Sequence, residues 1–143
     1  MNRRFGEAIK AGVKYRPRPG AYGILRLCRQ MLITHQSQPD EEYQLPGGGI
    51  DAGESPLAAL HREVFEETGW GMSVERRMGA FLRYTYMPEY DFWARKICHI
   101  YLCRPTRQKG DIPEPFHTAH WIDISEARHI LSNQGDRHFV GLL

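Results

Sequence analysis

The stretch GGIDAGESPLAALHREVFEETGW, residues 48–70, predicts a glycine-rich loop that leads into a single helix. Ser55 is a good N-cap, Pro56 suits the first helical position, and Gly69 is the residue type that often ends a helix. The residues that recur at helical spacing form a largely apolar stripe: Leu57, Leu60, His61, Val64 and Thr68. This stripe predicts that the helix packs one face against the rest of the domain.

Glu63, Glu66 and Glu67 form an acidic band beside this stripe, near the C-terminal end of the helix. Like charges three or four residues apart repel each other, and negative charge at a helix C-terminus opposes the helix dipole. Together these effects destabilise the helix by roughly 1–2 kcal/mol. Arg62 is the nearby cation that can pair with Glu66. An ordinary solvated acidic face is one interpretation of the band, but a bound divalent cation explains more.

The residue types around this band suit a metal that prefers oxygen ligands. Carboxylates on one helix face match Mg²⁺ or Mn²⁺, which bind a few carboxylates, waters and substrate phosphates. Gly47–Gly49 precede the helix and let the backbone approach the site closely. Neither cysteine nor several histidines lie close in sequence, so zinc is not indicated. The sequence therefore predicts Mg²⁺ or Mn²⁺ as the cofactor.

The spacing of the polar residues forms a longer motif. From Gly48, five residues lead to Glu54 and seven more lead to Arg62 and Glu63, after which the chain reads VFEETGW. This pattern resembles a complete Nudix box over residues 48–70, the signature of the Nudix, or MutT-like, hydrolase family. Seven fixed residues at average usage coincide about once in 10⁸ starting points. Trp70 is a soft departure, because an aliphatic residue is commoner at that position.

The resemblance implies an α+β fold, a Nudix-type α/β/α sandwich with a mixed β-sheet and at least two helices. It implies divalent-metal-dependent hydrolysis of a pyrophosphate bond in a nucleoside diphosphate linked to another moiety, by attack of a metal-activated water on phosphorus. Carried over by position, the metal ligands are Glu63, Glu66, Glu67 and the Gly47 carbonyl. Arg62 would orient the carboxylates, and Glu63 would also help to deprotonate the water. The residues expected to support the loop and helix are Gly48, Glu54 and Gly69.

The family often recruits a further carboxylate from a later loop. Glu114 is the expected catalytic residue of this kind, with Glu89 and Asp91 as alternatives. In some members an acid directly precedes the tryptophan of the last strand, but His120 stands there in this chain. The identity of the general base is therefore left open.

Tyr86, Arg16 and Arg18 are the candidate substrate-binding residues. Tyr86 can stack on a base and lies sixteen residues beyond the box, a spacing similar to that of the diadenosine polyphosphate hydrolases. Either arginine can bind phosphate oxygens bidentately. The alternatives are that Tyr86 packs in the core and that both arginines belong to a solvated arm. The expected substrate is a small nucleotide pyrophosphate, either a nucleoside triphosphate or a dinucleoside polyphosphate. A non-catalytic Nudix domain that binds or senses a nucleotide is the alternative function, and the unbroken carboxylate set weighs against it.

The charge distribution predicts a basic N-terminal arm over residues 1–19, and the resemblance implies that residues 20–143 form a single Nudix hydrolase domain. Residues 1–20 hold six basic residues and one acid, whereas the remainder carries 13 basic and 16 acidic residues. The formal net charge of +2 is too small to indicate a nucleic-acid partner, and no apolar run approaches the length of a membrane span. A monomer or a homodimer is expected.

Three cysteines, Cys28, Cys98 and Cys103, are too few and too odd in number for a disulfide framework. They predict buried thiols in a reducing compartment, the cytoplasm. A zinc site built from Cys98, His99 and Cys103 is disfavoured, because residues 98 and 103 would point to opposite faces of a strand.

Alternating apolar residues predict the remaining secondary structure. Strands are expected at 21–29, 30–36, 72–86, 96–104 and 118–124, with a tight turn around Arg29 and Gln30. The segment EYQL adds a short strand before the glycines. A second helix, capped by Ser125, is expected over residues 125–133 and precedes a short C-terminal tail.

Overall fold

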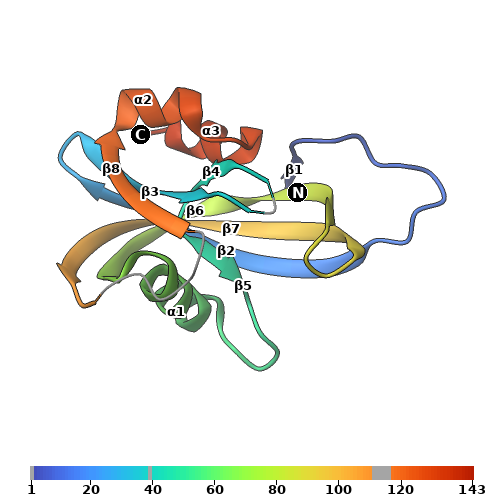
Figure 1. Cartoon of the computed structure of the whole chain (residues 1–143), viewed down its shortest axis with the longest axis horizontal. Coiled ribbons are helices and arrows are strands. Elements are labelled where there is room, and N and C mark those ends of the chain that lie inside the picture. The colour runs from blue at the N-terminus through green and yellow to red at the C-terminus, as the bar shows by residue number, and fades with distance from the viewer. Residues whose placement is uncertain (1, 39, 111–116) are drawn as a thin grey trace.

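In residues 2–38, 40–110 and 117–143, the part of the chain that the computed structural model describes, eight strands form one mixed sheet. Helix α1 covers one face of this sheet, and α2 and α3 cover the other (Figure 1). The strands are β1 (Arg3–Arg4), β2 (Arg16–Leu27), β3 (Gln30–Gln36), β4 (Glu42–Gln44), β5 (Gly47–Gly49), β6 (Trp70–Met87), β7 (Phe92–Gln108) and β8 (His117–Asp123). The helices are α1 (Pro56–Thr68), α2 (Ile124–Ile130) and α3 (Gln134–Val140). The predicted α/β/α sandwich is confirmed.

Strand β2 lies in the interior of the sheet and connects its parts. It pairs in parallel with β7, from Arg16 opposite Ala94 to Leu25 opposite Cys103, and in antiparallel orientation with β3 and β5. Strands β6 and β7 form a long antiparallel hairpin, and β8 pairs with β3. The short strand β5, which the sequence suggested as part of a loop, is thereby held against the middle of β2.

Helix α1 has the ends that its sequence predicts. Ser55 Oγ accepts a hydrogen bond from Ala58 N at 3.1 Å, and Gly69 adopts a φ of 74° while its N–H donates to Phe65 O. The buried residues of the helix are Ala59, Leu60, Val64, Glu67 and Thr68. The predicted stripe was wrong at Leu57 and His61, which are exposed, because the buried face is turned toward Glu67.

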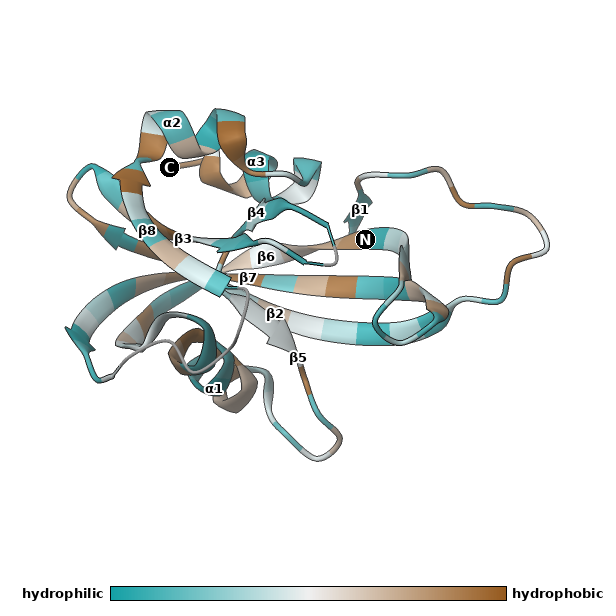
Figure 2. Cartoon of the chain, in the orientation of Figure 1, coloured by the Kyte–Doolittle hydropathy of each residue, from teal (hydrophilic) through white to brown (hydrophobic). Residues whose placement is uncertain are grey.

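Two apolar cores lie on the two faces of the sheet. One contains Leu60 and Val64 of α1, and the other contains Ala127 of α2 and Phe139 of α3. Apolar residues, brown in Figure 2, recur along β7 between these layers. Because β7 contributes alternate residues to each core, Cys98 packs in one and Cys103 in the other.

Cys28 is exposed, so the prediction that all three thiols are buried was wrong at this residue. It occupies the turn between β2 and β3 with a φ of 56°. The tight turn therefore lies at Cys28 and Arg29, one residue earlier than expected.

The C-terminal region differs most from the sequence prediction. The N-cap of α2 is Asp123 rather than Ser125, since Asp123 Oδ1 accepts a hydrogen bond from Ser125 N at 2.9 Å. The expected tail instead contains helix α3, whose N-cap Asn133 accepts from Asp136 N at 2.8 Å. A helix of seven residues is marginal by itself, and burial of Phe139 and Val140 in the core stabilises it.

The N-terminal segment contacts the sheet at two points. Strand β1 pairs in parallel with β6, and β2 begins at Arg16, inside the stretch predicted as the basic arm. The division into residues 1–19 and 20–143 stays a prediction. None of the helices in the described residues is long and apolar enough to cross a bilayer.

Candidate active site

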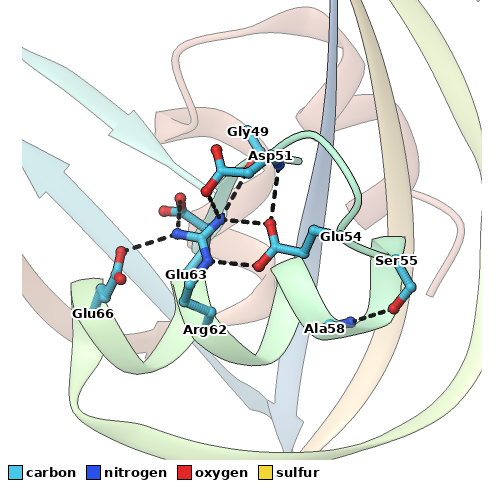
Figure 3. A network of polar contacts seen from close by, with 8 residues as sticks. All are labelled: Gly49, Asp51, Glu54, Ser55, Ala58, Arg62, Glu63 and Glu66. Atoms are coloured by element: carbon cyan, nitrogen blue, oxygen red, sulfur yellow. Dashed lines mark hydrogen bonds and ion pairs between the residues drawn. The ribbon is translucent and has the colours of Figure 1, made fainter.

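Arg62 joins the helix to the loop that precedes it (Figure 3). Its Nε donates to Glu54 Oε2 at 2.7 Å and its Nη2 donates to Glu54 Oε1 at 2.9 Å, a bidentate pair. The same Nη2 donates to the Gly49 carbonyl at 3.1 Å and lies 3.3 Å from Asp51 Oδ2. Hydrogen bonding to Arg62 lowers the pKa of Glu54 to about 2, and the same contact raises the pKa of Arg62. Glu54 and the end of β5 are thus fixed relative to α1.

The other side of the Arg62 guanidinium faces two of the predicted metal ligands. Nη1 donates to Glu63 Oε1 at 2.8 Å and to Glu66 Oε2 at 3.3 Å. The Glu63 side chain is 15% exposed, whereas that of Glu66 is 38% exposed. Arg62 therefore offsets part of the repulsion in the acidic band and restricts the position of Glu63.

The glycines of β5 are required by close contacts. A Cβ on Gly47 would lie 2.2 Å from the Ala21 carbonyl oxygen, and its φ of 146° also favours glycine. A Cβ on Gly48 would lie 2.5 Å from Glu63 Oε2, and one on Gly49 would lie 2.3 Å from Arg18 Nη2. The bare backbone of β5 thus lets Glu63 and Arg18 approach neighbouring residues of one strand.

These groups form the wall of a cavity of about 570 Å³. Glu63 and Glu67 line it together with the three glycines of β5, and Arg18 and Tyr86 of the sheet line it as well. Glu66 does not line the cavity; it lies beside Arg62 (Figure 3). The structure therefore brings together two of the three predicted carboxylate ligands with Gly47, Arg18 and Tyr86.

The donor set on this wall fits a hard divalent cation. Glu67 is only 5% exposed, and burying a carboxylate is costly unless other groups compensate its charge. The oxygens of Glu63 and Glu67 and the backbone of β5 are of the type that Mg²⁺ and Mn²⁺ prefer. Within the described residues, however, no three acidic, histidine or cysteine side chains converge in metal-binding geometry. Glu66 would have to leave Arg62 to complete the predicted ligand set.

The remaining predicted site residues have varied positions. Glu114 lies outside the described residues, while Glu89 lines the cavity. Asp91 accepts a hydrogen bond from the Tyr86 hydroxyl, which raises the pKa of Tyr86. Arg16 is not among the residues that line the cavity, and its guanidinium lies 5.2 Å from the centroid of the Phe92 ring.

Several cavity residues were missed by the sequence analysis. Tyr22, Arg83, Lys96 and Asp136 line the cavity on the side away from α1. Burial raises the pKa of Tyr22 to about 12, and Tyr22 raises the pKa of Lys96. A lysine at the start of the apolar run KICHIYLC was the one sequence signal, because its side chain shares a face with Cys98.

Asp136→Asn is expected to stabilise the protein at high pH and not at low pH. Asp136 is 3% exposed, and burial raises its pKa from 3.8 to about 6. The native state therefore holds a proton that the unfolded state has lost, so stability falls as pH rises from about 4 to about 6. Removing the charge should restore about 3 kcal/mol at pH 8 and almost nothing below pH 4, measured by urea unfolding. Exposed Asp40→Asn is the control, and an equal gain for Asp136→Asn at both pH values would contradict the assignment.

The model of the NUDIX domain family matches residues 14–143. The chain belongs to the NUDIX domain family. A solved Nudix hydrolase from Nitrosomonas europaea superimposes with a TM-score of 0.72 over 88% of this chain and 87% of that chain, at 17% identity. At this identity the likeness shows the fold alone. The family resemblance and the Nudix fold predicted from residues 48–70 are both confirmed.

Curated Nudix relatives match shorter regions. A Helicobacter pylori (strain G27) protein named RNA pyrophosphohydrolase is 42% identical over 60 residues, 39% of this chain and 38% of that protein. A Bacillus subtilis (strain 168) protein, provisionally named an 8-oxo-dGTP diphosphatase, is 31% identical over 70 residues, 49% of this chain and 47% of that protein. The chain therefore spans less than half the length of these two relatives.

Proposed function

We propose that this chain is a divalent-metal-dependent pyrophosphohydrolase whose substrate is a nucleoside 5′-polyphosphate. The observation that carries the proposal is the arrangement of the Nudix box in space. Arg62 fixes Glu54 and Glu63, and Glu63 and Glu67 form one wall of a cavity large enough for a nucleotide. A domain that only binds a nucleotide has no need of this complete and partly buried carboxylate set.

The residues of the cavity wall have distinct roles in this proposal. Glu63 and Glu67 would hold Mg²⁺ or Mn²⁺, and the Gly47 carbonyl would be a further ligand. Glu66 would have to leave Arg62 to contribute to the same set. When bound, the cation neutralises charge on the diphosphate and lowers the pKa of a bound water. Arg62 keeps the Glu63 carboxylate in one orientation, and Glu63 helps to accept the proton from the attacking water. Glu114 or Glu89 is the further base.

The proposed substrate class rests on two other residues that line the cavity. Arg18 places a guanidinium next to Gly49, where it can bind phosphate oxygens, and Tyr86 offers a ring that can stack on a base. The names of two relatives, an RNA pyrophosphohydrolase and an 8-oxo-dGTP diphosphatase, refer to RNA and to a nucleoside triphosphate. The proposed substrates are therefore nucleoside triphosphates, dinucleoside polyphosphates and RNA with a 5′-triphosphate.

Metal removal and a substrate panel test this function. Phosphate and nucleotide release would be measured on the three proposed substrates and on nucleotide sugars, with EDTA and after restoring Mg²⁺ or Mn²⁺. We expect activity on at least one 5′-polyphosphate. This activity should be lost in EDTA and return when the metal is restored. Nucleotide binding without release of phosphate or pyrophosphate across the panel would refute the proposal and favour a non-catalytic Nudix domain.

A further inference from the structure

Three basic residues lie side by side across three neighbouring strands of the cavity floor. Arg83 of β6 is directly opposite Lys96 of β7, and Lys96 is in register with Arg18 of β2. All three side chains line the cavity. Neighbouring strands lie about 4.8 Å apart, so this cation row extends about 10 Å across the sheet.

The cation row is unfavourable unless an anion offsets it, since like charges on directly opposite strand residues destabilise a sheet. Within the described residues, none of the three takes part in an ion pair. Arg18 lies 5.4 Å from the centroid of the Tyr90 ring, and Lys96 lies 5.7 Å from that of Tyr22. These ring contacts hold the cations in place without neutralising them.

Asp136 is an acid buried near the cation row. Burial raises the pKa of Asp136 to about 6, so near neutral pH this side chain still carries a negative charge that offsets part of the row. The positive charges of Lys96 and Arg83 lower the pKa of Asp136, but neither residue forms an ion pair with it. One such charge cannot neutralise three cations, so the cation row keeps positive charge for a ligand.

The cation row begins next to the proposed metal-binding wall. Glu63 contacts Gly48, and the Arg18 guanidinium contacts the next residue, Gly49. Arg18 is then followed across the sheet by Lys96 and Arg83. A phosphate chain that lies beside the wall formed by Glu63 and Glu67 would reach Arg18 first and the other two cations beyond it.

The geometry points to a second anion subsite: the cation row binds a phosphate group of the substrate other than the two that flank the cleaved bond. The substrate class is then a nucleotide with at least one phosphate beyond the diphosphate, in its polyphosphate chain or on the linked moiety. Nucleoside diphosphates linked to an uncharged sugar leave the cation row unused. This inference rests on the proposed function, because that function makes the bound ligand a substrate.

Binding of inorganic tripolyphosphate in EDTA tests the subsite without catalysis. Calorimetry on the full chain at low salt should show binding that weakens about 10- to 100-fold in Lys96→Met and in Arg83→Met, because each loses a charge-assisted contact. The matched control is Arg95→Met, one residue before Lys96 on the opposite face of β7. Lys96→Arg keeps the cation and should bind within a few-fold of the wild type. Equal affinity in all variants, or an equal loss in Arg95→Met, would overturn the subsite.

Steady-state kinetics then connect the subsite to the substrate. Lys96→Met and Arg83→Met should raise KM for a nucleoside tetraphosphate about tenfold or more with little change in kcat, and should leave KM for a nucleotide sugar unchanged. Parallel rises in KM for both substrates would overturn the assignment. If no substrate is turned over, the proposed function fails, while the tripolyphosphate measurement still decides whether the subsite exists.

Discussion

Glu67→Gln is expected to lower kcat on the best substrate by about 10³-fold while the protein keeps its fold. Glu67 is 5% exposed and lines the cavity beside β5. A water molecule or another side chain therefore has little access to take the place of its carboxylate. The amide keeps the size of the carboxylate but removes the charge that attracts a divalent cation. Initial rates at saturating substrate, with and without Mg²⁺, measure the effect.

The melting temperature separates loss of metal binding from damage to the fold. Mg²⁺ should raise the melting temperature of the wild type and leave that of Glu67→Gln almost unchanged, because a ligand stabilises only the state that binds it. In EDTA the variant should still unfold in one cooperative transition, which shows that its fold is intact. Glu75→Gln, on the exposed part of β6, is the control. Wild-type turnover in Glu67→Gln would refute its assignment as a metal ligand.

Glu66→Gln tests whether the third carboxylate belongs to the same set. Glu66 contacts Arg62 and is 38% exposed, so its resting position is outside the cavity. We expect a smaller loss of kcat than in Glu67→Gln, because Glu66 would have to leave Arg62 before it could bind the metal. A loss as large as that of Glu67→Gln would show that the resting position does not limit its role.

The site could be predicted from the sequence where its geometry is local. Ser55, Pro56 and Gly69 define α1 through contacts within the helix and its ends, and residues 48–70 contain the whole box. The contact of Arg62 with Glu66 also follows from the helical repeat. The orientation of the helix about its own axis does not follow from the local sequence. The exposure of Leu57 and the burial of Glu67 were therefore not predicted.

The cation row of the cavity is formed by pairing between strands that are distant in sequence. Arg18 and Lys96 are 78 residues apart and meet only through the register of β2 and β7. Strand register is set by the whole sheet, so no local pattern indicated the cation row. Helix α3 was missed for a similar reason, because Phe139 and Val140 stabilise it through the core rather than through helix propensity.

Arg62→Met is expected to lower the melting temperature by several degrees and kcat about 10- to 100-fold. The substitution leaves Glu54 and Glu63 close to each other with their shared cation removed, and it frees the Gly49 carbonyl. Glu63 then loses its fixed orientation, and loss of such supporting contacts typically reduces activity by this amount. Arg62→Lys should lose most of the same stability, because an ammonium cannot bridge both carboxylates with the fork of a guanidinium.

The pH dependence of this loss identifies Glu54 as the main partner. Arg62 holds the pKa of Glu54 at about 2 instead of 4.5, so its stabilising effect is fully present above pH 4.5 and disappears as pH falls through about 2. The stability difference between wild type and Arg62→Met should therefore be largest near neutral pH and shrink toward pH 2, measured by urea unfolding. In a Glu54→Gln background, Arg62→Met should cost clearly less than in the wild type. Additive effects of the two substitutions would mean that Arg62 stabilises the protein through Glu63 or the β5 backbone rather than through Glu54.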